Sequence, residues 1–287
     1  MPAAASVAVV TDSTSYLPEG LAEARGVRVV PLEVRLGKRV GREGVDIGTA
    51  ELVAALADRT LDVQTSRPTP AELAEQFRAA LDAGAPAVVS IHLSRALSGT
   101  WDAARQAADE VDAERVRVVD SQATGMGLGF AVLAAADAAD AGGDATAVES
   151  AAADVAARCR MFFSVETLDR LRRGGRIGAA AALLGTALAV KPMLHVAQGR
   201  ILPLEKVRTS AKAAQRLVEL AVRAAGEGPV DLAVHHLGAA ARAEEVAARL
   251  RERLPEVTRL LVSEVGAVIG AHVGMGLLGV VVVPHRQ

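Results

Sequence analysis

The first half of the chain alternates short apolar runs with amphipathic segments, and this alternation limits the folds that are open to it. Strand-like runs lie at 6–11, 27–34, 87–93 and 115–119, and helix patterns lie at 49–56, 71–83 and 100–111. The run from Ser6 to Thr11 is typical of a strand buried on both faces. Helices between such strands return the chain so that the next strand runs parallel. The sequence therefore predicts an α/β fold with a Rossmann-like, mostly parallel sheet flanked by helices.

The second half of the chain follows a different pattern after a break near 142–155. It contains a strand pattern at 161–165, a hairpin pattern at 192–204, helix patterns at 210–225 and 239–254, and strand patterns at 230–235, 257–265 and 280–283. A hairpin combined with helices indicates a smaller α+β domain. Because 287 residues are enough for two cores, we expect an N-terminal domain at 1–155 and a C-terminal domain at 156–287.

Composition argues against several classes of protein. The chain is 51% hydrophobic and 23% charged, its formal net charge is -2, and only 2% of its residues are aromatic. Nucleic-acid binding usually needs a basic face and stacking aromatic rings, so we set that class aside. Cys159 is the only cysteine, which rules out an intramolecular disulfide, and no metal-ligand spacing surrounds it.

The N-terminus lacks the basic region and apolar core of a signal peptide, so we expect a cytoplasmic protein. Two apolar runs approach the length of a membrane span. The run at 177–190 is too short, and the run at 268–284 is interrupted by His272 and four glycines. We therefore expect no membrane span.

Polar side chains gather where the predicted strands give way to helices. They occur at 11–13, 65–66, 94–98 and 120–121. Taken singly, each cluster is a turn or a helix cap. Ligands gather outside the carboxyl ends of parallel strands, however, so several clusters at such junctions favour a shared polar site. Asp12 and Asp120 are interpreted as turn caps or, alternatively, as a carboxylate pair for acid–base chemistry.

Motifs for nucleotides and metals are weak or missing. The chain has no GxxxxGKS/T loop and no GxGxxG at a strand–helix junction, and the glycines at 125–129 indicate close backbone packing. His235 and His236 end a predicted strand, but no third ligand stands at a suitable spacing. We interpret both histidines as structural or cleft-lining, and we expect no metal and no cofactor.

Several short segments resemble the DegV family in their order and spacing. They are VTDSTS at 10–15, TSRPTP at 65–70, LSRALSGT at 93–100, VDS at 119–121, GGRI at 174–177, KPMLH at 191–195, LEKVRT at 204–209 and GAHVGMG at 270–276. Each segment is a weak signal alone, but together they span nearly the whole chain. The resemblance implies a two-domain α/β protein that binds a long-chain fatty acid, with the carboxylate at the cleft between the domains.

The resemblance also implies a partner. Related members work with a separate, ATP-dependent fatty acid kinase, which phosphorylates the bound carboxylate to an acyl phosphate for phospholipid synthesis. This chain is thus expected to be a lipid-binding carrier rather than an enzyme, with the fatty acid as its ligand and no other cofactor.

Within these motifs, Thr65 and Ser98 match the carboxylate-binding hydroxyls of the family, and Ser66 and Gly99 stand beside them. A buried carboxylate is costly unless hydrogen bonds satisfy it. Hydroxyl groups and backbone N–H groups near helix N-termini are suitable donors, and Thr65 and Ser98 both precede predicted helices. The residues themselves are therefore compatible with the role that the resemblance implies.

Arg208 and His272 match family positions linked to phosphoryl transfer or head-group recognition. Without the resemblance, we would interpret Arg208 as a solvated cation and His272 as a structural residue. The sequence departs from the family pattern at Arg67, usually Gln, at Arg95, usually small or polar, and at Met275, usually Pro. The two extra cations act on the head group only if they face it.

Two other functions stay open from the residues alone. A phosphotransferase or hydrolase of a small polar substrate would use His272 with Asp12 or Asp120 at the same cleft. A pure interaction protein would leave the cleft empty. Co-purification of a fatty acid with the protein separates the carrier hypothesis from both.

Overall fold

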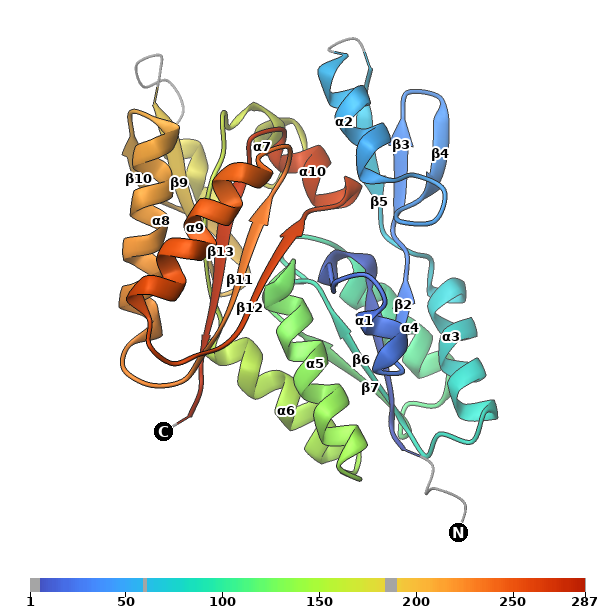
Figure 1. Cartoon of the computed structure of the whole chain (residues 1–287). Helices are drawn as coiled ribbons and strands as arrows, with labels where there is room; N and C mark the ends of the chain where they lie inside the picture. The colour runs from blue at the N-terminus through green and yellow to red at the C-terminus, as the bar shows by residue number, and fades with distance from the viewer. Residues whose placement is uncertain (1–5, 59–60, 184–189, 287) are drawn as a thin grey trace. The chain divides into compact units, whose positions relative to one another are not determined.

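The computed structural model describes residues 6–58, 61–183 and 190–286. By its internal contacts the chain divides into two compact units (Figure 1). Unit 1 comprises Met1–Glu33 and Ser66–Ala157, and unit 2 comprises Val34–Thr65 and Arg158–Gln287. The segment Val34–Thr65, which we expected in the N-terminal domain, belongs to unit 2 by its contacts. The domain limits at 155 and 156 stay a prediction.

Unit 1 is built on a four-stranded sheet in the order β2-β1-β6-β7, and every pairing in it is parallel. Its strands are β1 (Ala8–Asp12), β2 (Arg28–Val30), β6 (Val88–His92) and β7 (Val116–Asp120). Its helices are η1 (Ser13–Ser15), α1 (Leu21–Ala24), α3 (Pro70–Asp82), α4 (Thr100–Val111), α5 (Met126–Asp140) and α6 (Ala145–Arg158). The predicted parallel sheet is confirmed.

The core of unit 1 lies between the sheet and the helix pair α3 and α4. Leu73 and Phe77 of α3 and Ala104 of α4 pack with Val10 and Val88 of the two central strands. Helix α5 covers the opposite face of the sheet (Figure 1). Because both faces of the sheet are covered, polar residues can gather at the carboxyl ends of its strands, where Asp12 and His92 lie buried.

Unit 2 contains a six-stranded mixed sheet in the order β10-β9-β8-β13-β11-β12 and a three-stranded sheet in the order β4-β3-β5. Its strands are β3 (Glu33–Leu36), β4 (Arg39–Arg42), β5 (Val63–Ser66), β8 (Arg160–Ser164), β9 (Lys191–Ala197), β10 (Arg200–Val207), β11 (Val230–His236), β12 (Val257–Glu264) and β13 (Leu278–Pro284). Its helices are α2 (Thr49–Ala57), α7 (Asp169–Arg173), η2 (Gly178–Leu183), α8 (Ser210–Ala225), α9 (Ala240–Arg253) and α10 (Ala267–Val273). Helices α8 and α9 pack on the six-stranded sheet (Figure 1).

Three segments differ from their predicted structure. The strand pattern at 27–34 forms two strands, β2 and β3, because Pro31 between them has no N–H to donate to a sheet. The expected break at 142–155 contains helix α6. The glycine-rich segment near His272 contains helix α10. Among the described residues, no helix is both long and apolar enough to cross a bilayer.

The carboxylate of Asp12 fixes the end of the central strand of unit 1. Asp12 is fully buried, and its Oδ1 accepts hydrogen bonds from the backbone N–H and the hydroxyl of Thr14 at 3.0 and 2.6 Å. Its Oδ2 accepts from the N–H of Leu93 at 3.0 Å and lies 3.0 Å from His92 Nδ1. His92 Nε2 in turn lies 2.7 Å from Ser90 Oγ. Asp12 therefore joins the ends of β1 and β6 through hydrogen bonds.

We expect Asp12→Ala to lower the free energy of unfolding by about 3–5 kcal/mol, because several buried donors lose their acceptor. Asp12→Asn keeps an acceptor oxygen and should lose less. Urea unfolding followed by circular dichroism measures both. Asp140→Ala is the control, because that exposed carboxylate belongs to a surface ion pair and should change stability by less than about 1 kcal/mol. A loss in Asp12→Ala no larger than in this control would show that the buried carboxylate is dispensable.

Candidate anion-binding site

A cavity of about 770 Å³ lies within unit 2, where β5, α7 and α10 come together. This volume is within the range of about 300–1,000 Å³ that is typical of ligand pockets. Its polar lining consists of Asp62, Gln64, Thr65, Glu166, Thr167, Asp169, Arg170, Arg173, Arg176 and His272. Leu56, Leu61, Val63 and Met275 add apolar surface. A wall of this composition suits a polar or charged group with an apolar part attached.

Thr65 and His272 meet in this cavity. Thr65 Oγ1 lies 2.9 Å from His272 Nε2, although the two residues are 207 positions apart in the chain. Thr65 stands near the end of β5 and His272 near the end of α10, and both side chains are half-buried. The structure thus brings together two of the residues that the sequence analysis assigned to the head group.

The imidazole of His272 is neutral at pH 7. Burial, and to a lesser degree the charge of nearby Arg176, lowers the pKa of His272 to about 4. In a neutral imidazole one ring nitrogen donates a hydrogen bond and the other accepts. When Nε2 carries the proton, it donates to Thr65 Oγ1, and the Thr65 hydroxyl keeps its own hydrogen for an anion. A chain of donors in one direction polarises the outgoing hydrogen bond and strengthens it.

Gly174 leaves the space that His272 occupies. Its φ of −75° is open to any residue, so the backbone itself does not require glycine. A Cβ at this position would collide with Nδ1 of His272. Arg176 Nη1 donates to the carbonyl oxygen of Gly174 at 2.5 Å. The Gly-Gly-Arg segment therefore lies against the Nδ1 side of the imidazole ring, whereas Thr65 is hydrogen-bonded to Nε2.

Three arginines and three carboxylates line the cavity. Arg170 donates to the carbonyl oxygen of Leu56 at 3.3 Å, and burial together with the charge of Arg173 lowers the pKa of Arg170. The carboxylate of Glu166 is paired with Lys191 and so contributes little net negative charge. An anion beside Thr65 would therefore experience a favourable electrostatic potential.

Ser98 lies in unit 1, in the turn that leads into α4. Its Oγ lies 2.9 Å from Thr100 Oγ1 and accepts the N–H of Thr100 at 3.3 Å. Gly99 is the N-cap residue of α4, and Ser66 is exposed at the end of β5. The Ser98 hydroxyl therefore stands at a helix N-terminus, where the helix dipole favours negative charge.

The two unusual arginines of the family motifs both lie at the Ser98 turn. Arg67 Nη1 donates to the carbonyl oxygen of Gly99 at 3.3 Å, and a Cβ on Gly99 would collide with this guanidinium. The guanidinium carbon of Arg95 lies 5.1 Å from the centroid of the Trp101 ring, a cation–π distance. Each guanidinium thus adds positive charge to the turn that holds Ser98.

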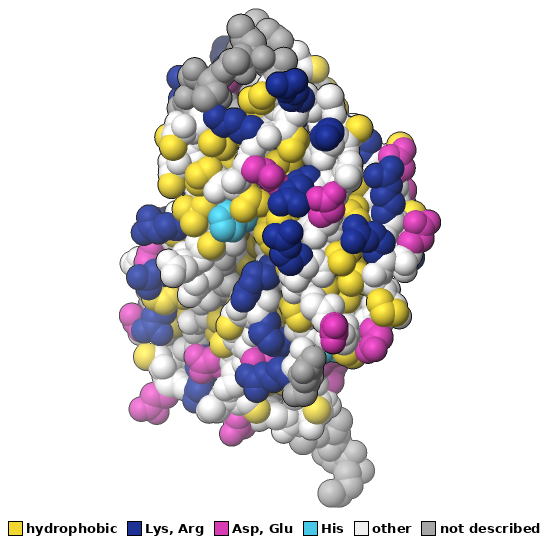
Figure 2. Space-filling view, turned by 90° about the vertical axis from the view of Figure 1, so that its left-hand side faces the viewer, with side chains coloured by type: hydrophobic (Ala, Val, Ile, Leu, Met, Phe, Trp, Pro, Cys, Tyr) yellow, Lys and Arg dark blue, Asp and Glu magenta, His cyan; other side chains and the backbone are white. Residues whose placement is uncertain are grey.

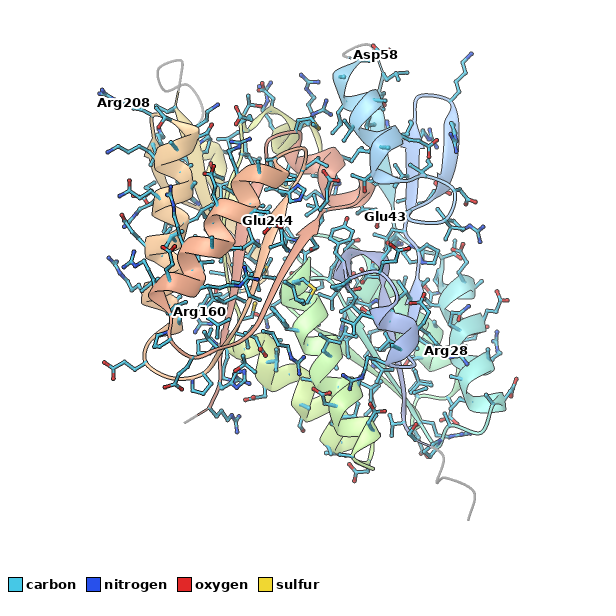
Figure 3. The ribbon with its side chains drawn as sticks, in the orientation of Figure 1. Arg28, Glu43, Asp58, Arg160, Arg208 and Glu244 are labelled. Atoms are coloured by element: carbon cyan, nitrogen blue, oxygen red, sulfur yellow. The ribbon has the colours of Figure 1, made fainter. Side chains whose placement is uncertain are left out.

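Arg208 stands apart from the cavity of unit 2. It follows β10, is exposed, and is not among the described residues that line the cavity. Figure 2 shows the side of the molecule that carries α8 and β10, where many Lys and Arg side chains gather. In Figure 3 the Arg208 side chain points outward near the start of α8. An exposed cation on such a face suits contact with an anionic partner better than burial with a carboxylate.

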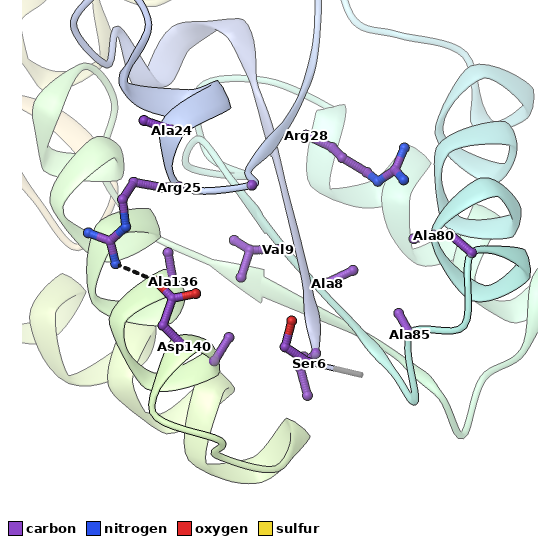
Figure 4. A pocket seen from close by; sticks show the side chains of 14 residues that line it. Ser6, Ala8, Val9, Ala24, Arg25, Arg28, Ala80, Ala85, Ala136 and Asp140 are labelled. Carbon is purple, nitrogen blue, oxygen red and sulfur yellow. Dashed lines mark hydrogen bonds and ion pairs between the residues drawn. The ribbon is translucent and has the colours of Figure 1, made fainter. Parts of the chain in front are cut away.

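A second cavity, of about 370 Å³, lies in unit 1 beside the start of β1. Figure 4 shows Arg25 on one side of it, paired with Asp140, and Arg28 on the other. Arg25 also pairs with Asp137 at 2.5 Å, so its charge is already balanced. Most of the remaining wall is alanine. We therefore favour the cavity with the Thr65–His272 pair as the anion site.

The other titratable groups singled out in the sequence have structural partners, except that the buried Nδ1 of His236 makes no hydrogen bond to the described residues. Asp120 Oδ1 accepts backbone N–H groups from Gln122 at 2.9 Å and from Arg95 at 3.3 Å, as a turn cap does. His235 Nδ1 lies 3.0 Å from a serine hydroxyl, and burial lowers the pKa of His235 to about 4. His236 Nδ1 lies 3.6 Å from Glu264 Oε1. In the part of the chain that the structure describes, no three His, Cys, Asp or Glu residues are placed to hold a metal ion.

The serine–histidine–aspartate chain of unit 1 does not form a usable nucleophile. Ser90, His92 and Asp12 stand in the order that activates serine in hydrolases. All three side chains are fully buried, however, so a substrate cannot reach the serine. This hydrogen-bonded chain supports the strand ends of unit 1.

The fold and the cavity together define a two-unit α/β protein with a pocket in unit 2 whose lining is partly polar and partly apolar. A family model described as "Uncharacterised protein, DegV family" matches residues 6–285. A DegV domain-containing protein of Streptomyces coelicolor is 56% identical over 276 residues, which cover 96% of this chain and 98% of that protein. The chain belongs to the DegV family.

Solved structures agree with this assignment. A DegV family protein from Thermus thermophilus, described by its fatty acid binding, has a TM-score of 0.89 and 36% identity, covering 98% of this chain and 100% of that chain. DegV from Bacillus subtilis, described as a fatty acid binding protein, has a TM-score of 0.88 and 32% identity, with coverage of 98% and 100%. The predicted family and the predicted fold class are confirmed.

We expect Gly174→Ala to displace His272 and break its hydrogen bond to Thr65, because the new methyl group takes the place of Nδ1. Overpacking of this kind costs about 1–3 kcal/mol of stability. A crystal structure and urea unfolding measure the two effects. Gly48→Ala is the matched control, because a Cβ there has open space. An unmoved His272 ring in Gly174→Ala would contradict the role assigned to this glycine.

Proposed function

We propose that this chain binds one long-chain fatty acid through its carboxylate, with the hydroxyls of Thr65 and Ser98 as hydrogen-bond donors. The observation that carries the proposal is the hydrogen bond between half-buried Thr65 and neutral His272 in the cavity of unit 2. The descriptions of the similar Thermus thermophilus and Bacillus subtilis proteins as fatty acid binding support it. Thr65 belongs to unit 2 and Ser98 to unit 1.

A carboxylate fits the donors at Thr65 for a physical reason. An anion that leaves water needs hydrogen bonds to replace its hydration. His272 can orient the Thr65 hydroxyl so that its hydrogen points away from the ring and toward an acceptor. Ser98 adds a second hydroxyl at the N-terminus of α4, with Arg67 and Arg95 close to the same turn. Hydrogen bonds to a charged acceptor are stronger than those between neutral groups.

The acyl chain supplies most of the affinity in this proposal. Each buried CH₂ group contributes about 0.8 kcal/mol, so a long chain outweighs the head group. Leu56, Leu61, Val63 and Met275 offer apolar surface next to the polar lining. A longer apolar slot for the rest of the chain stays a prediction.

We further propose that the bound fatty acid is presented to a separate, ATP-dependent kinase. A carboxylate oxygen attacks the γ-phosphorus of ATP, ADP leaves, and an acyl phosphate forms. The sequence has no phosphate-binding loop of its own, so the partner supplies the nucleotide site. Arg208 is exposed and can meet the partner or the transferred phosphoryl group. In this proposal the chain is a carrier and not an enzyme.

We expect Thr65→Val and Ser98→Ala each to weaken fatty-acid binding by about 1–3 kcal/mol, or roughly 5- to 150-fold, because a charged acceptor loses a donor. Titration of the delipidated proteins with a fluorescent fatty acid measures the change. Thr167→Val is the matched control, because Thr167 lines the same cavity without a proposed role. If all three variants bound the fatty acid with equal affinity, Thr65 and Ser98 would not be the carboxylate-binding residues.

We expect Arg208→Ala to retain fatty acid but to support little acyl-phosphate formation with the cognate kinase and ATP. A cation that meets only the developing charge stabilises the transition state and not the bound ground state. A radiolabelled ATP assay with and without kinase measures product, and Arg200→Ala, an exposed arginine at the start of β10, is the control. If the chain and ATP alone gave product, the carrier hypothesis would be wrong. The chain would then be an enzyme, a phosphotransferase that acts at the same cavity.

A further inference from the structure

Glu43 is a buried carboxylate that the proposed function does not use. It stands in the turn after β4, is only 5% exposed, and is labelled in Figure 3. Its Oε1 accepts the backbone N–H of Val268 at 2.7 Å, across 225 positions of sequence. A carboxylate so far from water needs strong compensating contacts, so this hydrogen bond is a defining part of the local structure.

Helix α10 depends on this contact for its first turn. The N-cap of α10 is Gly266, which has no side chain that could accept a hydrogen bond from the helix. The first N–H groups of a helix lack partners within the helix, and a negative charge at this end is favourable. Glu43 supplies both an acceptor and a negative charge from a distant segment. Glu43 therefore acts as a helix cap in place of the N-cap side chain that Gly266 lacks.

The segment Val34–Thr65 holds α10 at two further points. Leu52 of α2 packs against Gly270 so closely that a Cβ on Gly270 would collide with it. Thr65 forms its hydrogen bond with His272 near the end of the helix. Contacts at the beginning, middle and end of α10 thus come from one segment. Three such points fix both the position of the helix along its axis and its rotation about that axis.

We propose that Glu43 is a positioning residue for the head-group site, because its carboxylate fixes α10 so that His272 Nε2 faces Thr65 Oγ1. Glu43 is not among the described residues that line the cavity, so it acts through the helix and not on a ligand. The proposal rests on the proposed function only where it assigns the Thr65–His272 pair to a fatty-acid head group. The positioning itself can be observed without any ligand.

The titration of His272 reports the position of α10. The charged residues that line the cavity with His272 are Asp62, Glu166, Asp169, Arg170, Arg173 and Arg176. None of them is changed by a substitution at Glu43. Loss of a carboxylate by itself disfavours the imidazolium and can only lower the pKa of His272. Movement of the ring toward water raises it, because burial is the main cause of the present low pKa. The two effects have opposite signs.

The experiment uses the full chain without fatty acid, labelled with ¹⁵N-histidine, as Glu43→Ala and Glu43→Gln. The His272 imidazole signals are identified by their loss in His272→Gln and followed by NMR from acidic to neutral pH. Glu51→Gln is the matched control, since Glu51 accepts the N–H of Gly48 at the start of α2 and not of α10. The same proteins are then titrated with a fluorescent fatty acid.

In Glu43→Ala we expect the pKa of His272 to rise from about 4 toward its ordinary value of about 6.5, and fatty-acid affinity to fall about tenfold. Glu43→Gln keeps an acceptor oxygen but loses the charge, so we expect a smaller rise. The control should keep the parent values for both measurements.

An unchanged or lowered pKa of His272 in folded Glu43→Ala overturns the proposal. If Glu43→Ala does not fold, Glu43→Gln decides by the same criterion. A rise in the pKa of His272 with unchanged fatty-acid affinity in the Glu43 variants and in Thr65→Val supports the positioning role and instead removes the proposed function. The two hypotheses therefore fail by different measurements.

Discussion

The hydrogen bond between a neutral histidine and a threonine hydroxyl is the interaction on which the site in unit 2 depends. Burial and the charge of Arg176 keep His272 uncharged, because an imidazolium there would lose its hydration beside another cation. A neutral ring can orient the Thr65 hydroxyl through its hydrogen bond without adding charge to the cavity. The close approach of Gly174 and the capping of α10 by Glu43 both hold the ring in this arrangement.

Local signals in the sequence were enough to predict most of unit 1. Helix α3 begins as expected because Thr69 and Glu72 form a capping box, and the parallel strands follow from their apolar runs. Tertiary contacts decided the rest. The segment Val34–Thr65 joins unit 2, and α10 forms in a glycine-rich segment that Glu43 caps from afar. Neither feature leaves a signal in the local pattern, because the contacts behind them join residues that are more than one hundred positions apart.

The candidate site, like the fold, could be predicted only in part from the sequence. The resemblance to a family singled out Thr65 and His272, but only the structure shows that they touch. The sequence grouped Arg208 with His272, whereas Arg208 is exposed and outside the lining of the cavity. Sequence reasoning did not assign a role to Glu43, since a lone glutamate in a turn is ordinarily a solvated residue. Its burial separates it from the exposed carboxylates, and burial is a property of the fold.

Binding and turnover place opposite demands on charge in the proposed function. A cation paired directly with the carboxylate would stabilise the ground state and so hinder its reaction as a nucleophile. Donors that are neutral, such as the Thr65–His272 pair, hold the anion while leaving it reactive. Phosphorylation then adds negative charge, which a cation at the surface or on the partner can meet in the transition state. The exposure of Arg208 and the neutrality of His272 fit this division.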